Sequence, residues 1–164
     1  MKTRILALAL LASIPLACGD DPEHEEPSLD AVACEHLKGT EVKALTAAAT
    51  REAAPAVAAD HHRYELALVD AAGGKGGFVS FAVAEAGDHV LFLDAEVPVK
   101  LADAGGTAIA FEKSEKSSAD CPEVKGRHVA HLEVGTVFLE LGPTEAAAVN
   151  LVIEGEGHEH ENHD

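Results

Sequence analysis

Aromatic and basic side chains are both scarce in this sequence. Its 164 residues include no Trp, one Tyr and five Phe, so little aromatic surface is available. Sugar-binding platforms and base-stacking sites usually need more of it. Lys and Arg number 12 against 29 Asp and Glu, and the net charge is −17. Because so acidic a body repels nucleic acid and anionic lipid headgroups, we expect no nucleic-acid partner and a surface suited to solubility or cation binding.

The motifs of common hydrolases and zinc proteins are also missing. The sequence has no Gly-x-Ser-x-Gly elbow, no His-Glu-x-x-His pair and no Cys-x-x-Cys pair. Ser80 falls within an expected strand, and Ser114, Ser117 and Ser118 have no histidine beside them in the sequence. We therefore predict that the protein is not an enzyme and that it needs no obligatory cofactor. Histidines far apart in the chain could still meet in three dimensions.

The apolar run at the start of the chain is too short to cross a membrane. Residues 5–14 form this run, after Lys2 and Arg4, and a transmembrane helix needs ~20 apolar residues. A basic start, a short apolar stretch and small residues at its end are typical of a secretory signal. We therefore predict that residues 1–17 are a signal peptide that is removed on export.

The end of this signal, Leu16-Ala17-Cys18, resembles the lipobox of bacterial lipoproteins. The resemblance implies cleavage before Cys18 and acylation of its sulfur and amino group with fatty acids such as palmitate. Two or more acyl chains anchor a protein stably, so the membrane would be its partner and the bacterial cell envelope its location, facing the periplasm or the cell surface. The sequence departs from the lipobox at Pro15, where the family usually has Leu. An ordinary signal peptide with a stray cysteine is the alternative.

A tether is expected to follow the signal, over residues 18–30. Residues 19–29 are acidic, contain two prolines and are nearly free of apolar side chains, so they cannot pack into a core. His24 lies among Glu23, Glu25 and Glu26, an arrangement that suits either a weak cation site or a solvated run of charge.

The other two cysteines are Cys34 and Cys121. Because exported proteins form disulfides, we predict a bridge between them. It would tie the first segment apolar enough to touch a core, residues 31–37, to a polar loop at residues 112–120. Two inert buried thiols are one alternative, and metal ligation by Cys34 with His36 is another.

Alternating apolar residues predict β-structure from Asp60 onward, as in Tyr64, Leu66 and Leu68. A glycine-rich turn is expected at residues 73–77, and Pro98 predicts an edge strand because it cannot donate to a ladder. Residues 40–49 favour an edge strand over an alanine-rich helix. The further strands are expected at residues 78–84, 89–94, 97–101, 107–111, 127–132, 136–141 and 148–153. Residues 31–155 should therefore form an all-β, antiparallel, jelly-roll-like β-sandwich of about eight strands, with disordered tails.

Parts of this region resemble the bacterial pre-peptidase C-terminal domain. The resemblance lies in residues 77–83, 86–90, 99–107 and 132–141, which contain the strand, glycine, strand pair and the late Gly135-Thr136 strand start. Val137 stands where the family has an aromatic residue. The resemblance implies a small sandwich that serves as an accessory or binding module, and it brings no catalytic residues with it.

The end of the chain is rich in histidine and acid. Residues 156–164 are expected to be disordered, and they offer five candidate metal ligands: His158, Glu159, His160, Glu161 and His163. Imidazole suits Zn²⁺, Cu²⁺ and Ni²⁺, and short His-rich tracts are a metal-binding composition. A solvated acidic tail that binds nothing is the alternative.

Two functional hypotheses follow from the sequence. The first is a membrane-anchored, exported lipoprotein whose sandwich is a non-catalytic binding or scaffolding module. The second is a divalent-metal binder or buffer in the same compartment, which would act through the His- and Glu-rich tail. The protein or glycan partner of the sandwich is not specified by any motif.

Overall fold

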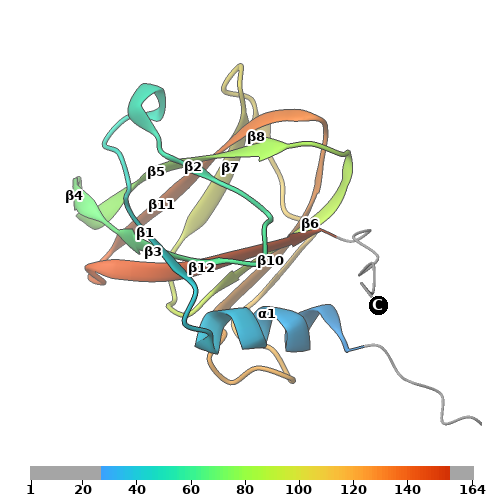
Figure 1. Cartoon of the computed structure of the whole chain (residues 1–164). Helices are drawn as coiled ribbons and strands as arrows, with labels where there is room; N and C mark the ends of the chain where they lie inside the picture. The colour runs from blue at the N-terminus through green and yellow to red at the C-terminus, as the bar shows by residue number, and fades with distance from the viewer. Residues whose placement is uncertain (1–26, 156–164) are drawn as a thin grey trace, which may run out of the picture.

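The computed structural model describes residues 27–155, which form one α-helix, one 3₁₀ helix and twelve strands (Figure 1). The elements in chain order are α1 (Leu29–Lys38), β1 (Val42–Thr46), η1 (Arg51–Ala53), β2 (Ala56–Val57), β3 (Arg63–Ala67), β4 (Val69–Ala71), β5 (Gly74–Val83), β6 (Gly87–Leu93), β7 (Val99–Asp103), β8 (Ala108–Ile109), β9 (Lys113–Glu115), β10 (Gly126–Leu132), β11 (Gly135–Thr144) and β12 (Ala148–Gly155). In this part of the chain no helix is long and apolar enough to span a membrane.

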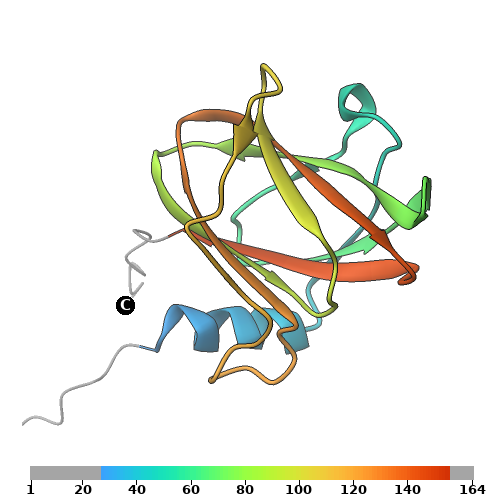
Figure 2. The same ribbon diagram turned by 180° about the vertical axis from the view of Figure 1, so that it is seen from behind.

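The strands form two sheets that face each other (Figures 1 and 2). One sheet has the order β1-β3-β12-β6-β10-β9 and the other the order β2-β5-β11-β7-β8, with β4 added beside β5. The prediction of an all-β sandwich is therefore confirmed. The strands beyond the expected eight are short ones, such as β2, β4 and β9.

Both sheets are mixed, whereas the sequence pattern had suggested antiparallel pairing throughout. β1 runs parallel to β3, and β2 runs parallel to β5. A parallel neighbour needs a crossover of a dozen or more residues. Residues 47–62 connect the first pair and residues 58–73 the second, so both connections are long enough. The predicted edge strand at residues 40–49 is confirmed, because β1 ends its sheet.

The main core lies between the sheets, where alternate residues of each strand point inward. Its largest fully buried members include Leu66, Leu91, Leu139, Leu151 and Ile153. These residues come from β3, β6, β11 and β12, so both layers contribute to one apolar interior. The inward-facing set predicted for β3 is confirmed, since Tyr64, Leu66 and Leu68 are all buried.

Helix α1 covers the outer face of the β6 and β12 sheet (Figures 1 and 2). Here a second, smaller core joins Ala33 and Leu37 of the helix to Val90, Phe92 and Val152 of the strands. Strands β6 and β12 are therefore buried on both faces. This explains their nearly continuous apolar sequences.

The helix begins within the range that was expected to be a tether. Ser28 is its N-cap, and its hydroxyl accepts a hydrogen bond from the Ala31 backbone N–H at 3.2 Å. Leu29 and Asp30 are already helical, so the folded part starts before residue 31. The prediction that residues 31–37 touch a core is confirmed by burial of Leu37 and Cys34.

The glycine-rich stretch at residues 73–77 is mostly strand, and only residues 72–73 form the turn. Strand β5 begins at Gly74 and pairs with β11. A Cβ atom on Gly76 would lie 2.5 Å from the Leu141 carbonyl oxygen. These glycines therefore allow close approach of β5 to β11.

Two other local expectations need correction. Pro98 precedes β7, and β7 lies between β11 and β8 with only a two-residue neighbour on its outer side. The polar loop at residues 112–120 contains β9, which pairs with β10.

Candidate metal centre

Three side chains from distant parts of the sequence meet at one end of the helix-covered sheet. His36 comes from α1, His61 from the loop before β3, and Glu154 from the end of β12. One ligand atom from each lies within 4.8 Å of those of the other two. We call these residues the three-residue site.

Strand β12 places Glu154 under the helix. Glu154 pairs with Val90 of β6, and it lies on the same face of β12 as Val152, which packs against α1. Its side chain is 4% exposed. Burial, followed by the negative charge of Asp60, raises the pKa of the Glu154 carboxyl to about 7. Within residues 27–155, its Oε1 atom has no hydrogen-bond partner.

Each of the two imidazoles lies next to a different oxygen of the Glu154 carboxylate. Nε2 of His36 is 3.7 Å from Glu154 Oε1, and Nδ1 of His61 is 3.4 Å from Oε2. The two rings are tilted by 40° with their centroids 5.3 Å apart. The 3.7 Å separation is longer than an N–H to oxygen hydrogen bond.

His61 has a left-handed backbone with φ of 60°, the one positive φ at a non-glycine residue in the described range. Such a conformation costs an ordinary side chain about 1 kcal/mol or more, and it persists where the surroundings hold it in place. Tyr64 holds this loop: its hydroxyl accepts from the Ala58 N–H at 3.0 Å and donates to the Asp60 carboxylate at 3.0 Å. Lys43 adds an ion pair to Asp60 at 2.5 Å.

Asp60 therefore remains a charged neighbour of the site. Burial raises the pKa of its carboxyl, but hydrogen bonds from Lys43 and Tyr64 outweigh that effect and hold the pKa below its ordinary value. Its negative charge opposes ionisation of Glu154. A dication at the site would reverse this penalty, because it would be attracted by both carboxylates.

The spacing of the three ligand atoms suits a small transition-metal ion. Donor atoms about 2.0–2.2 Å from a tetrahedral Zn²⁺ are separated by roughly 3.4 Å. Each imidazole lies 3.4 or 3.7 Å from a different oxygen of Glu154, and one ligand atom from each of the three residues lies within 4.8 Å of the other two. Two imidazoles and a carboxylate are a usual set for a three-ligand site with an open fourth position. The His61 side chain is 44% exposed, which leaves the site accessible from solvent.

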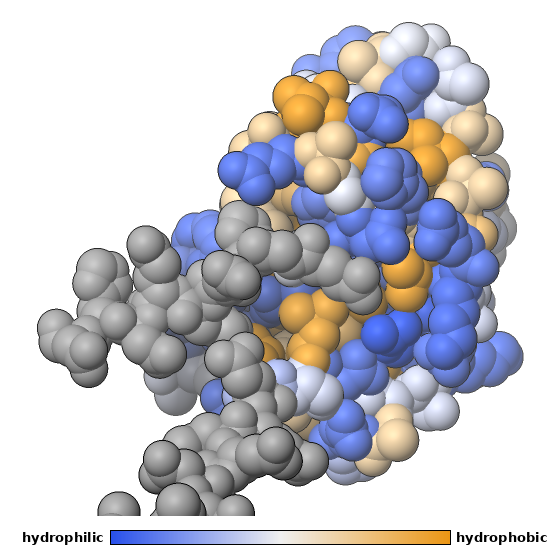
Figure 3. Space-filling model, turned by 90° about the vertical axis from the view of Figure 1, so that its right-hand side faces the viewer, coloured by the Kyte–Doolittle hydropathy of each residue, from blue (hydrophilic) through white to orange (hydrophobic). Residues whose placement is uncertain are grey.

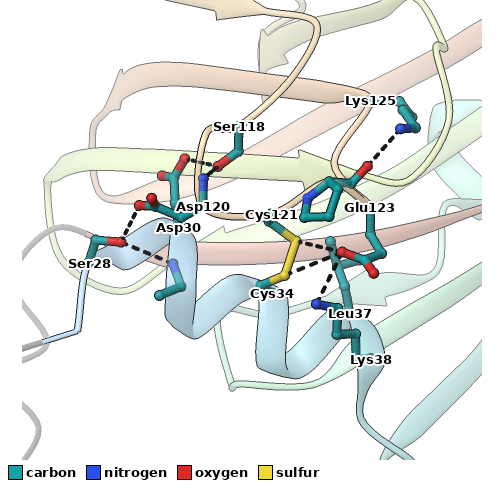
Figure 4. The surroundings of a disulfide bond; sticks show 12 residues. Ser28, Asp30, Cys34, Leu37, Lys38, Ser118, Asp120, Cys121, Glu123 and Lys125 are labelled. Atoms are coloured by element: carbon teal, nitrogen blue, oxygen red, sulfur yellow. Dashed lines mark hydrogen bonds and ion pairs between the residues drawn. A yellow bond between two sulfur atoms is a disulfide. The ribbon is translucent and has the colours of Figure 1, made fainter.

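A disulfide fixes the helix that carries His36. The predicted bridge between Cys34 and Cys121 is present, with the two Cα atoms 5.4 Å apart (Figure 4). Oε2 of Glu123 lies 3.5 and 3.4 Å from the two sulfurs. These are contacts without a hydrogen bond, because a disulfide has no S–H. Since ligation requires a thiolate, the bridged Cys34 is not a partner for His36 in metal binding.

The N-terminal half of α1 is held by a polar cluster, part of which is drawn in Figure 4. Asp30 accepts hydrogen bonds from Ser118 Oγ at 2.6 Å and from Arg127 Nε at 3.0 Å. Ser28 donates to Asp120 at 2.7 Å. At the other end of the helix, Arg63 donates to the Leu37 carbonyl at 2.6 Å. The helix thus has contacts with the sandwich along its whole length.

The histidines of β10 do not join the site. His128 is partly buried, and this burial lowers its pKa. His131 is exposed and donates through Nδ1 to Asp88 at 2.7 Å. A cleft of about 260 Å³ is lined by residues that include Ala59, Phe81, His89 and Gly155, and by none of the three ligands of the three-residue site.

Most site residues considered from the sequence, for lipidation or for metal binding, lie outside the described residues. These are Cys18, His24, His158, Glu159, His160, Glu161 and His163. His36 had been considered as a metal ligand together with Cys34, and the roles of His61 and Glu154 were missed. The available signals were the Asp60-His61-His62 run and one acid closing an apolar strand, which do not reveal a contact between distant segments.

Comparison with known proteins adds no relative to these findings. No protein-family model matches the chain, and none of the curated proteins searched matches it.

Proposed function

We propose that this protein is an exported, lipid-anchored β-sandwich module that binds a divalent transition-metal cation at the three-residue site. The observation that carries the proposal is the convergence of His36 and His61 on the buried carboxylate of Glu154. A buried carboxylate is costly unless a cation or hydrogen bonds compensate it. Two nitrogen donors beside it make a metal cation the best-matched compensation.

The competing explanation of this geometry is that each histidine simply forms an ion pair with the Glu154 carboxylate. Charge-assisted hydrogen bonds between such groups are typically about 2.7–2.9 Å long. The distances of 3.4 and 3.7 Å exceed this range and resemble the spacing between two ligands of one ion. The net charge of −17 also favours a cationic ligand.

The histidine-rich tail is proposed to assist this site. His158, His160 and His163, with Glu159 and Glu161, follow closely after Glu154 in sequence. Because an extended chain advances at most ~3.6 Å per residue, His158 stays within about 14 Å of Glu154. The tail can therefore bind ions itself and raise their concentration beside the folded site.

The lipid anchor is proposed to keep the module close to a membrane. Residues 18–28 connect the acylated Cys18 to the N-cap of α1, a distance of at most about 36 Å when extended. On this proposal, so short a connection would keep the metal site in the layer of solvent next to that membrane.

A non-catalytic module that binds a protein or glycan without metal is the second candidate. The cleft of about 260 Å³ beside Phe81 and His89 is the feature that favours it. The surface offers less support, since the large hydrophobic side chains exposed within the described range are Val42 and Val134. On the face shown in Figure 3, apolar groups are interspersed among hydrophilic ones.

Calorimetry with Zn²⁺, Cu²⁺ and Ni²⁺ tests the proposal. The exported protein should release heat with each ion, and a chain ending at Gly155 should retain one binding event. His61→Ala or Glu154→Gln should remove that event, while His131→Ala, which changes an exposed histidine elsewhere, should leave it intact. Equal and negligible heats from the exported protein and all variants would exclude metal binding.

A further inference from the structure

Helix α1 carries both a half of the disulfide and a ligand of the three-residue site. Cys34 and His36 are two positions apart on it. Cys34 bonds to Cys121 in the segment before β10, and His36 faces Glu154 at the end of β12. One short helix is thus tied to the sandwich at two points by two different chemistries.

The helix depends on these ties because it shares no sheet hydrogen bonds. A helix of ten residues is marginal in water by itself, so its stability comes from docking. Apart from the bridge, its contacts with the sandwich include the small apolar core, the Asp30 cluster, the bond from Arg63 to Leu37 and an ion pair between Lys38 and Glu123. Undocking would move His36 away from Glu154, which stays in the sheet.

We infer that the Cys34–Cys121 bridge and the metal at His36, His61 and Glu154 are two coupled attachments of helix α1 to the sandwich, each of which strengthens the other. The inference rests on the proposed metal binding. A closed bridge holds His36 beside the other two ligands, which raises its effective concentration there. By linkage, a bound metal must favour the closed bridge by the same factor.

This coupling connects metal loading to the compartment. Closing the bridge removes two electrons and two protons from the two thiols, and in an exported protein a partner disulfide accepts them and becomes two thiols. Before export the thiols stay reduced, and α1 is held less firmly. Metal binding at this site is therefore tighter in the oxidising compartment than before export.

The coupling is tested most directly by a variant that lacks the bridge and also has no free thiols in its place. Reduced Cys34 and Cys121 lie beside Glu123 and could themselves ligate metal, so both are changed to Ala. Zn²⁺ is titrated into the exported protein against a chromophoric chelator. Typical couplings between two sites change affinity 5- to 150-fold, and we expect Cys34→Ala with Cys121→Ala to weaken Zn²⁺ binding about tenfold.

The same change in a His36→Ala background supplies the control. There the bridge has no ligand to position, and its removal should alter the remaining Zn²⁺ affinity less than about twofold. If Glu154→Gln weakens Zn²⁺ binding but removal of the bridge does not, the coupling is wrong and the proposed site is still supported. If wild type and Glu154→Gln bind Zn²⁺ equally, the proposed site itself is wrong.

A second measurement uses only the intact protein, in case the bridge-free variant fails to fold. A phosphine reductant opens the bridge, and with one water it becomes a phosphine oxide while the two sulfurs become thiols. Saturating Zn²⁺ should slow this reduction several-fold in wild type and leave the rate unchanged in His36→Ala. The same rate with and without Zn²⁺ in wild type would overturn the coupling.

Discussion

Nδ1 of His61 lies 3.4 Å from Oε2 of Glu154, and one residue comes from a loop while the other closes the last strand. The contact combines two unfavourable local features, a left-handed histidine backbone and a buried carboxyl. Proteins keep such features where the surrounding structure holds them and where they serve a function. This combination supports the proposed metal site at the end of β12.

Glu154→Gln should stabilise the metal-free protein at high pH and change it little at low pH. The raised pKa of about 7 means that folding disfavours the charged carboxyl. This penalty is absent below the ordinary pKa of 4.5, grows as pH rises, and is complete above 7. At about 1.4 kcal/mol per pKa unit, its upper limit is on the order of 3 kcal/mol.

Urea unfolding with chelator present, at pH 5 and pH 8, measures this difference. Glu140→Gln, on the partly exposed surface of β11, serves as the control and should show little change. An equal effect of Glu154→Gln at both pH values would contradict the assigned burial.

The pKa of His131 should lie above the usual histidine pKa, and that of His128 below it. The hydrogen bond to Asp88 raises the pKa of His131, whereas burial lowers the pKa of His128. NMR titration should show both directions, and Asp88→Asn should bring the pKa of His131 back toward 6.5. In wild type, the contact between protonated His131 and Asp88 stabilises the folded state. This stabilisation is complete below pH 6.5 and is lost as pH rises through the raised pKa of His131. An unchanged His131 titration in Asp88→Asn would refute this pairing.

Asp30→Asn should destabilise the fold by about 1–3 kcal/mol. It takes away the charged partner of Arg127, whose side chain is only 16% exposed, and a negative charge in the first turn of α1. Chemical denaturation measures the loss. Asp70→Asn, which breaks the ion pair of a 92% exposed carboxylate with Lys75, should change stability by less than about 0.5 kcal/mol. Similar losses in the two variants would contradict a structural role for Asp30.

Replacing His158, His160 and His163 with Ala should remove the metal bound by the tail and leave the melting temperature of the metal-free sandwich unchanged. Neutral imidazoles ligate metal, so this binding should weaken as pH falls from about 7 to about 5.5. Cu²⁺ should bind the tail more tightly than Ni²⁺ or Zn²⁺. Calorimetry and thermal melts check both parts, and a marked fall in melting temperature would mean that the tail is part of the fold.

Cys18 should carry lipid in the mature protein. Intact-mass analysis of the membrane fraction is expected to show an acylated chain that starts at this residue. A soluble product with a free α-amino group would instead support the ordinary signal peptide.

Local patterns in the sequence were sufficient for much of the sandwich. Alternation at Tyr64, Leu66 and Leu68 predicts a half-buried strand because successive side chains point to opposite faces. Cysteine number and the expected export predicted the Cys34–Cys121 bridge, since only these two cysteines remain once Cys18 is assigned to the lipid anchor. The chain by itself thus determined its fold class and its covalent cross-link.

Tertiary structure decided where the helix lies and where the site forms. Whether a ten-residue segment is helical depends on the apolar surface it covers, here that of β6 and β12. The parallel pairing of β1 with β3 depends on a long crossover, which no local pattern specifies. His36, His61 and Glu154 meet only because α1 docks on the outer face of the sheet where β12 ends. Contacts between segments so distant in sequence arise from packing of the whole chain, and the periodicity of each segment contains no information about them.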